Sequence, residues 1–449
     1  MLTSLMQPTS LFHSHSLCLT AFLIFLLLSV HGSAQNESWL DSLLQSAQID
    51  IERLASSEMM GRGYTQAGHL HAASYIHKRF REIGLEDING SYYQKFGVVV
   101  DTFIRRPELT VDNLYLRFGK DFIINPGNAN GVEENIELVW IGSGLRLGKR
   151  LDEHRGKNLR GRVAVIETEI PTSISSDSTF DKKQLVLQQR IAHAIVAGAK
   201  GVLLLSDRPT YGSFFEQWPK PVFEVRREVI PLSAKDVSFT VHRTENIEIE
   251  TQNVVGLLPG TGETDSLLIV CGHYDHLGAI DDSLFFSGAN DNASGIALML
   301  GLAAQLKQSP LRYNVLFCAF SGEEIGLRGS RFFVENPPVD LNRVRFLINL
   351  DMAASGLDGI MALGGVDFSE EFRLLQSVHD SLEFPELRKR KNAPNSDHWF
   401  ILKKGVRGFY IYPFTGEQPY HHVDDTIETL QWETFERMFK LIYGFVLRM

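Results

Sequence analysis

The sequence predicts an α/β fold: a mixed, mostly parallel sheet flanked by helices, with a smaller β-rich α+β domain inserted into it. After Ile247, short β-branched segments alternate with amphipathic segments of helical periodicity, as in strands joined by crossover helices. Between Pro107 and Asn246, strand-like segments follow one another with few helices. A length of 449 residues also exceeds one typical hydrophobic core, so two domains are expected.

Composition and charge exclude several classes of protein. With 44% hydrophobic and 22% charged residues, the chain is neither disordered nor collagen-like. The formal net charge of −10 argues against nucleic acid as a partner. Cys271 and Cys318 lie in apolar strand-like segments, so we expect buried free thiols rather than a disulfide or a thiolate zinc site.

The N-terminus has the pattern of an export signal. An apolar segment, Cys18 to Val30, precedes Gly32-Ser33-Ala34, which fits a signal peptide over residues 1–34 with cleavage after Ala34. No Lys or Arg precedes the apolar segment, so a single N-terminal membrane anchor is the alternative. We expect an exported protein, periplasmic or extracellular, with no stable membrane insertion after cleavage.

The first part of the main domain, residues 35–106, reads as two helices and a strand. These are Trp39–Leu54, a helix from Ala67 to Ile83 that Gly84 ends, and a strand over Tyr93–Phe103.

The inserted domain is assigned to residues 107–246. Its expected strands are Leu109–Phe118, Ile136–Ile141, one ending at Ile166, Gly201–Leu205, Val222–Ile230 and Val237–His242, with one helix at Gln184–Ala197.

The second part of the main domain, residues 247–449, alternates strands with helices. The expected strands are Val254–Leu258, Ser266–Cys271, Asn314–Phe320, Val344–Leu350 and Gly408–Tyr412. The expected helices are Ser294–Gln308, Glu324–Glu335, Phe368–Leu382 and Leu430–Leu447.

Polar residues with metal-binding side chains follow these strands. The largest group is Cys271-Gly-His-Tyr-Asp-His-Leu-Gly278, followed by Gly288-Ala-Asn-Asp-Asn-Ala-Ser-Gly295. Others are Ser321-Gly-Glu-Glu324, Asp351, Ser396-Asp-His398 and Tyr420-His-His-Val-Asp-Asp-Thr426. A carboxylate at a helix N-terminus is more often a cap, but independent caps need not gather at one end of one sheet, where ligands bind in open α/β folds.

Histidines combined with Asp and Glu form a nitrogen and oxygen ligand set that suits zinc. One carboxylate could bridge two ions about 3.5–4 Å apart that share a water and polarise a carbonyl. Of two adjacent glutamates, one could bind metal while the other accepts the proton of the water.

These motifs together resemble those of the M28 family of zinc peptidases, secreted or membrane-bound dizinc aminopeptidases and their relatives. The resemblance covers nearly all of the chain after Ile247, and Arg62-Gly63 with the helix after it is similar to the family's N-terminal part. It implies the zinc exopeptidase fold and two bound Zn²⁺ ions.

The resemblance also implies a role for each matched residue. The metal ligands would be His273, Asp291 as the bridging ligand, Glu324, Asp351 and His421. Glu323 would be the general base and Tyr420 the donor to the reacting carbonyl, while Asp275 would stand behind His273 and orient it. His422 is the adjacent competitor of His421. Asp397 and His398 would support the site.

The insert resembles a protease-associated domain through Leu159–Ile166 and Ala194–Leu205, and an unrelated β-rich insertion is the alternative. In the family such a domain roofs the cleft or limits substrate size.

The implied function is an exopeptidase, above all an aminopeptidase that hydrolyses the N-terminal bond of a peptide substrate with zinc-activated water. Three alternatives stay open: a carboxypeptidase, which would need a cationic clasp such as Arg328, Arg388 or Arg390; a glutaminyl cyclase-like enzyme, against which the insert weighs; and a non-catalytic binding relative, against which the complete set of matched residues weighs.

Overall fold

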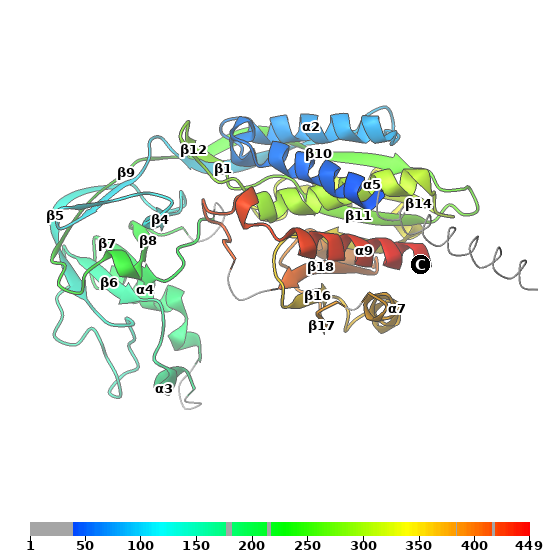
Figure 1. Cartoon of the computed structure of the whole chain (residues 1–449). Helices are drawn as coiled ribbons and strands as arrows, with labels where there is room; N and C mark the ends of the chain where they lie inside the picture. Colours follow the sequence, from blue (N-terminus) through cyan, green and yellow to red (C-terminus); the bar gives the residue numbers. More distant parts are fainter. Residues whose placement is uncertain (1–38, 177–181, 213–216, 383, 415–417) are drawn as a thin grey trace, which may run out of the picture. The chain divides into compact units, whose positions relative to one another are not determined.

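The computed structural model describes residues 39–176, 182–212, 217–382, 384–414 and 418–449 (Figure 1). The chain divides into two compact units, Met1–Ile49 and Asp50–Met449. Of the first unit, residues 39–49 are described, and they are helical. The predicted signal peptide, residues 1–34, lies outside the described residues. Within the described ranges no helix is long and apolar enough to cross a membrane.

The second unit contains an eight-stranded mixed sheet that carries the predicted metal-binding motifs. Its strands, in spatial order, are β1 (Tyr93–Phe103), β10 (Arg243–Leu258), β14 (Asn314–Phe320), β11 (Leu267–His273), β15 (Val344–Leu350), β18 (Gly408–Phe414), β16 (Gly359–Leu363) and β17 (Glu386–Arg390). The central strands β14, β11, β15 and β18 are parallel, and β1, β10 and β16 introduce the antiparallel pairs.

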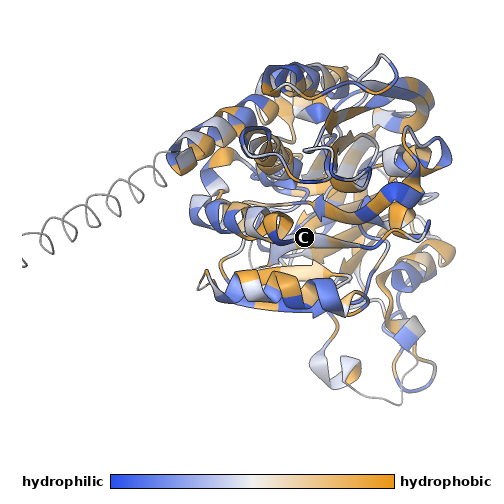
Figure 2. Cartoon of the chain, turned by 90° about the vertical axis from the view of Figure 1, so that its right-hand side faces the viewer, coloured by the Kyte–Doolittle hydropathy of each residue, from blue (hydrophilic) through white to orange (hydrophobic). Residues whose placement is uncertain are grey.

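Helices cover both faces of this sheet, as the predicted α/β fold requires. On one face α5 (Gly295–Gln308) lies against β11 and β15, and it contacts α2 (Gly68–Ile83) and α9 (Trp432–Arg448). On the other face α6 (Arg328–Glu335) contacts α8 (His398–Leu402). The first half of α5 is apolar on all sides, and residues 296–300 are all buried. Helix α7 (Ser369–Asp380) contacts α9. In Figure 2 the outer helices carry both hydrophilic and hydrophobic residues, as helices do that pack one face on a sheet.

A second eight-stranded sheet consists of strands between residues 108 and 241. In spatial order they are β3 (Leu114–Leu116), β2 (Glu108–Val111), β9 (Asp236–Val241), β5 (Gly131–Trp140), β6 (Val163–Glu167), β7 (Gly201–Ser206), β8 (Val222–Arg226) and β4 (Phe122–Ile124). Two short helices, α3 (Thr172–Ser175) and α4 (Leu187–Val196), belong to the same stretch of chain. These strands fall inside the range that the sequence assigns to an insert.

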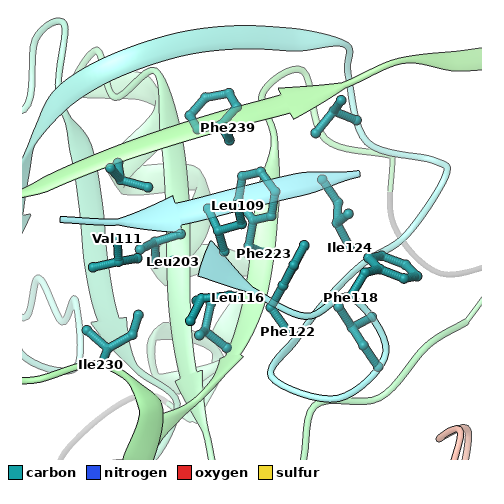
Figure 3. Close-up of a cluster of buried hydrophobic side chains, with 14 of the residues drawn as sticks. Leu109, Val111, Leu116, Phe118, Phe122, Ile124, Leu203, Phe223, Ile230 and Phe239 are labelled. Atoms are coloured by element: carbon teal, nitrogen blue, oxygen red, sulfur yellow. The ribbon is translucent and has the colours of Figure 1, made fainter. Parts of the chain in front are cut away.

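The core of the second sheet also includes residues from the chain after β11. Side chains such as Leu109, Phe223 and Phe239 point toward one another between the strands (Figure 3). Leu277 and Phe286, which follow β11 in the chain, belong to the same buried cluster. The second sheet therefore packs directly against the loop that leads to Asp291.

Several predicted boundaries are wrong, and turn chemistry explains two of them. The strand predicted over Leu109–Phe118 is a hairpin of β2 and β3, because Asp112 adopts a left-handed conformation with φ 50°. The helix predicted from Glu324 begins at Arg328, since Leu327 before it is also left-handed, with φ 57°.

Other boundaries depend on contacts that the local sequence does not contain. The strand predicted at Val254–Leu258 is the end of β10, which begins at Arg243 and pairs with β1 along most of its length. The strand predicted over Val222–Ile230 ends at Arg226 in a short 3₁₀ helix. The helix predicted from Gln184 begins at Leu187, because Val186 is extended.

Candidate metal centre and active site

The metal-binding side chains gather at the carboxyl ends of the central parallel strands. Strand β11 ends at His273, which lies opposite Phe320, the last residue of β14. Glu323 and Glu324 follow β14, and Asp351 follows β15. The carboxyl ends of parallel strands share one edge of a sheet, which is where α/β proteins bind ligands.

Asp291 lies between two histidines, one on each of its carboxylate oxygens. Its Oδ1 is 3.3 Å from Nε2 of His273, and its Oδ2 is 3.3 Å from Nε2 of His421. His421 comes from the loop after β18, so these three side chains converge from distant parts of the chain. A carboxylate that presents one oxygen to each side has the arrangement of a bridging ligand.

Each histidine has a second carboxylate at hydrogen-bond distance. Oδ1 of Asp351 is 3.3 Å from Nε2 of His273, and Oε2 of Glu324 is 3.1 Å from Nε2 of His421. Two groups, His273–Glu323–Asp351 and His273–Asp291–Glu324, have their ligand atoms within 4.8 Å of one another. The two groups share His273, and His421 adjoins the second group through Asp291 and Glu324.

The donor set fits a divalent cation such as zinc. Burial alone would raise the pKa of Asp291, but hydrogen bonds with His273 and His421 hold it well below its usual range, so the carboxylate is ionised. Ionised carboxylates together with imidazoles suit zinc without a thiolate. Cys271 and Cys318 are buried free thiols, as predicted.

Asp275 contacts the turn that carries the two glutamates more directly than it contacts His273. Its carboxylate accepts hydrogen bonds from the backbone N–H groups of Glu323 and Glu324, at 3.2 and 3.3 Å, and from the hydroxyl of Tyr64 at 2.8 Å. The nearest carboxylate oxygen is 3.8 Å from Nδ1 of His273, whereas the backbone oxygen of Asp275 is 3.1 Å from it. The carboxylate therefore fixes the Glu323 turn, and the backbone orients the imidazole.

Glu323 is half-buried at the edge of the cluster. Burial raises its pKa well above the usual range, and the carboxylates of Glu324 and Asp351 reinforce the effect, although His273 opposes it. A carboxyl group with a raised pKa is a stronger base than an exposed glutamate, as general acid–base catalysis near neutral pH requires.

The Tyr420–His422 loop separates the two competing histidines. The ring of Tyr420 stacks on His421 with centroids 3.9 Å apart, and Tyr420 remains 48% exposed. Burial and the nearby carboxylates of Asp291 and Glu324 raise the pKa of its phenol, which therefore stays protonated and can donate a hydrogen bond. Nδ1 of His422 instead lies 3.3 Å from Asp424, away from the cluster.

A chain of hydrogen bonds behind Asp351 fixes that carboxylate. Oγ of Ser396 donates to Oδ2 of Asp351 at 2.8 Å, and Nδ2 of Asn349 donates to the same Oγ at 2.8 Å. Sγ of Cys271 donates in turn to Oδ1 of Asn349 at 3.3 Å. The four residues are buried, so water does not compete for these bonds.

Arg62 makes a second set of hydrogen bonds behind the centre. The Arg62-Gly63 motif does not by itself predict these partners. The guanidinium is 0% exposed and donates only to backbone oxygens in the hydrogen bonds described. Its acceptors are Leu54, Tyr274, Ser287, Gly288 and Asp291, at 2.8 to 3.0 Å. Gly288 has no side chain to obstruct this, since a Cβ there would lie 2.6 Å from Nη2 of Arg62. Arg62 therefore anchors the loop that presents Asp291.

His276 is also part of the centre, and the sequence alone predicts no role for it. It is buried, and its Nδ1 lies 2.8 Å from Oε1 of Glu324. The oxygen of Glu324 that faces away from His421 is thereby occupied. The signal for His276 was its place in Cys271–Gly278, three residues after His273, but only the tertiary fold brings it to Glu324.

The remaining candidate residues contact neighbours outside the cluster of His273, Asp291, Glu324, Asp351 and His421. Asp397 and His398 are buried at the start of α8, and the ring of His398 lies against Tyr410 at 5.2 Å between centroids. Arg388 pairs with Glu386 within the exposed edge strand β17, which also contains Arg390. Arg328 donates to the backbone oxygen of Ile325 at 3.2 Å.

Comparison with known proteins shows which proteins this chain resembles. The profile of Peptidase family M28 matches residues 253–446. Aminopeptidase YwaD of Bacillus subtilis is 22% identical over 404 residues, which cover 83% of each chain. The probable lipoprotein aminopeptidase LpqL of Mycobacterium tuberculosis is 33% identical over 149 residues, 32% of this chain and 28% of the relative.

Solved structures agree with this fold. A zinc aminopeptidase from B. subtilis superposes with a TM-score of 0.65 and 21% identity, over 90% of this chain and 95% of that one. A peptidase M28 precursor from Shewanella amazonensis has a TM-score of 0.67 and 14% identity, over 92% and 96%. The chain therefore shares the fold of these two peptidase structures.

Proposed function

We propose that this chain is an exported dizinc aminopeptidase that hydrolyses the first peptide bond of its substrate. The observation that carries the proposal is the position of Asp291, with Oδ1 3.3 Å from His273 and Oδ2 3.3 Å from His421. Two histidines on opposite oxygens of one carboxylate favour two adjacent metal ions over one.

Five side chains would hold the ions. His273 and Asp351 would complete one site and His421 and Glu324 the other, with Asp291 shared. When bound, zinc supplies a Lewis acid that polarises a carbonyl and lowers the pKa of water.

Glu323 moves the proton in this proposal. Its backbone N–H donates to Asp275 at 3.2 Å, so the residue is held beside the cluster rather than in it. With its raised pKa, the carboxylate accepts a proton from the attacking water and then delivers it to the amine that leaves. General acid–base catalysis of this kind contributes about 10²–10⁴-fold to a rate.

Tyr420 stabilises the charge that develops on the carbonyl oxygen. Its phenol remains protonated because burial and nearby carboxylates raise its pKa. Stacking on His421 limits the orientations of the ring, so its hydroxyl would be preorganised as a donor.

The domain division and export belong to the same proposal. Residues 35–106 and 247–449 would form the peptidase domain, and 107–246 a protease-associated insert. The second sheet, with all its strands between residues 108 and 241, supports this division. Export rests on the signal-like sequence of residues 1–34.

An aminopeptidase is favoured over the alternative reactions. The relatives at 22% and 33% identity are named aminopeptidases. The carboxypeptidase alternative needs a cation near the centre for a terminal carboxylate, but Arg388 is engaged by Glu386 in an exposed strand.

The test combines zinc content with hydrolysis of aminoacyl p-nitroanilides, with and without chelator. We expect the chelator to abolish hydrolysis and Glu323→Gln to lower kcat by at least about 10²-fold with zinc retained. Glu263→Gln, a matched change at an exposed glutamate, should have no effect. Full activity of Glu323→Gln with zinc bound would contradict the mechanism, and absence of zinc from the wild-type protein would contradict the enzyme itself.

A further inference from the structure

His276 has no role in the mechanism above, although it lies within the candidate centre. It is buried, and its Nδ1 lies 2.8 Å from Oε1 of Glu324. A carboxylate that binds metal is ionised and can only accept, so Nδ1 is the nitrogen that donates. The other ring nitrogen, Nε2, is buried and has no hydrogen-bond partner among the described residues. The imidazole therefore directs its donor at a candidate metal ligand.

The backbone around His276 fixes the position of its ring. The N–H of His276 donates to the backbone oxygen of Arg62 at 3.4 Å. A Cβ at Gly288 would lie 2.4 Å from Cδ2 of the imidazole, so a glycine there leaves the room that the ring needs. The backbone oxygen of Gly288 accepts in turn from Nη2 of Arg62 at 2.8 Å. The ring is thus held before any metal binds, as a precise site requires.

Two adjacent residues of the loop after β11 hold Glu324 at its two ends. The N–H of Glu324 donates to Oδ2 of Asp275 at 3.3 Å, which fixes the backbone. His276, the next residue, fixes the far end of the side chain through Oε1. Without His276, this oxygen would be a buried acceptor that has lost a donor, and the carboxylate could rotate about its last bond.

The contact with His276 leaves the second oxygen of Glu324 for the centre. Oε2 lies 3.1 Å from Nε2 of His421, and that nitrogen lies 3.3 Å from Oδ2 of Asp291. Nδ1 of His276 is 4.0 Å from the same Oδ2 of Asp291, which is beyond hydrogen-bond distance. The geometry therefore indicates that His276 acts through Glu324.

The other half of the centre has a separate support. Asp351, the candidate partner of His273, accepts from Oγ of Ser396 at 2.8 Å, and Asn349 donates to that Oγ. Neither Asp275 nor His276 takes part in these hydrogen bonds. Each half of the centre therefore has its own hydrogen-bond network, and a change in one network should affect one half.

We propose that His276 is a positioning residue that fixes Glu324 and thereby sets the zinc affinity of the His421 half of the centre alone. The inference rests on the dizinc centre of the proposed function and assigns a residue that controls one of its ions. Loss of a hydrogen bond that orients a metal ligand weakens metal binding by about 10–100-fold. We expect His276 to control one of two stepwise zinc affinities by this factor.

Two substitutions separate the hydrogen bond from the volume of the ring. His276→Leu fills similar space without a donor, and competition with a chromogenic chelator should show one zinc step weakened by about 10–100-fold. His276→Asn carries an amide nitrogen on Cγ, where the imidazole carries Nδ1, and should restore most of the lost affinity. His379→Leu, at a buried histidine of α7, should leave both steps unchanged. Circular dichroism checks folding, and His276→Ala replaces His276→Leu if the latter does not fold.

Single-site backgrounds show which ion His276 controls. In His273→Ala protein the remaining zinc should lie with His421 and Glu324, and adding His276→Leu should weaken it by about 10–100-fold. In His421→Ala protein the remaining zinc should lie with His273 and Asp351, and adding His276→Leu should leave its affinity unchanged.

These zinc affinities separate the role of His276 from the proposed reaction. Unchanged affinities in His276→Leu, equal weakening of both steps, or an Asn variant as weak as the Leu variant would overturn the role of His276 and leave the peptidase proposal intact. Selective weakening of one step, in a protein that hydrolyses no aminoacyl p-nitroanilide, would support the role while the proposed reaction fails. A wild-type protein that binds no zinc would overturn both.

Discussion

Nη2 of Arg62 donates a hydrogen bond to the backbone oxygen of Asp291 at 3.0 Å, although 229 positions separate the two residues. The same guanidinium donates to Ser287 and Gly288, just before Asp291 in the chain. Burial lowers the pKa of Arg62 to about 10, with Asp291 and Asp425 acting in the opposite direction, so it stays charged at neutral pH. Arg62 thus holds the loop before Asp291 in place and adds a positive charge beside the carboxylates of the centre.

Arg62→Met should lower the free energy of unfolding by about 3 kcal/mol or more, because it leaves several buried carbonyls without donors. Denaturant unfolding of the metal-free protein measures this. Arg331→Met, at an exposed arginine paired with Glu335, should cost under about 1 kcal/mol. Equal stability of the two variants would show that Arg62 does not anchor the Asp291 loop.

Ser396→Ala should weaken zinc binding by about 10–100-fold, because Asp351 loses the hydroxyl that orients it at 2.8 Å. Competition with a chromogenic chelator measures the affinity. Ser396→Thr, which keeps the hydroxyl, should retain more of the affinity, and Ser377→Ala, at an exposed serine of α7, should retain all of it. If Ser396→Ala bound zinc as tightly as the wild type, the hydrogen bond from Ser396 would not contribute to zinc binding.

Tyr420→Phe should lower kcat by about 10²-fold while zinc content and KM change little, because the lost hydrogen bond forms with charge that develops in the transition state. Steady-state kinetics on an aminoacyl p-nitroanilide test it. Tyr115→Phe is the control, since Tyr115 is 57% exposed on the second sheet. A rise in KM with kcat unchanged would assign Tyr420 to substrate binding instead.

At acidic pH the Arg106–Asp281 ion pair should contribute much less to the free energy of unfolding. Burial would raise the pKa of Asp281, but hydrogen bonds from Arg106 and Ser283 prevail and lower it to about 2. A depressed folded-state pKa gives stability above the unfolded value of about 3.9 that is lost as the pH falls toward 2. The pair is partly exposed, so Asp281→Asn should cost only about 1 kcal/mol at pH 7 and much less at pH 2, where half of the folded-state carboxyl groups are protonated. Denaturant unfolding at both pH values checks this, and a cost independent of pH would contradict it.

The sequence predicted the part of the fold that local patterns encode. Strands β11, β14 and β15 are apolar segments in the sequence; Asp351 follows β15 directly, and Glu323 lies three positions after the end of β14. The alternation of strands and helices then predicted one shared edge for the polar groups, because the carboxyl ends of parallel strands lie at the same edge of a sheet.

What the sequence could not predict depends on contacts between distant residues. The first half of β10 is polar and exposed, and it is a strand because it pairs with β1. His276 and Arg62 read locally as a loop histidine and a turn arginine, and their partners Glu324 and Asp291 come from other segments. The Asp275 carboxylate was expected behind His273, yet the fold places it closer to the backbone of Glu323.

If Asp291 joins two metal sites, the zinc content of the protein after dialysis depends on this carboxylate. Elemental analysis should give two zinc ions per wild-type chain, about one for His273→Ala and for His421→Ala, and less than one for Asp291→Asn. His422→Ala should keep both, since Nδ1 of His422 faces Asp424. One zinc in the wild-type protein, or two in Asp291→Asn, would contradict the account.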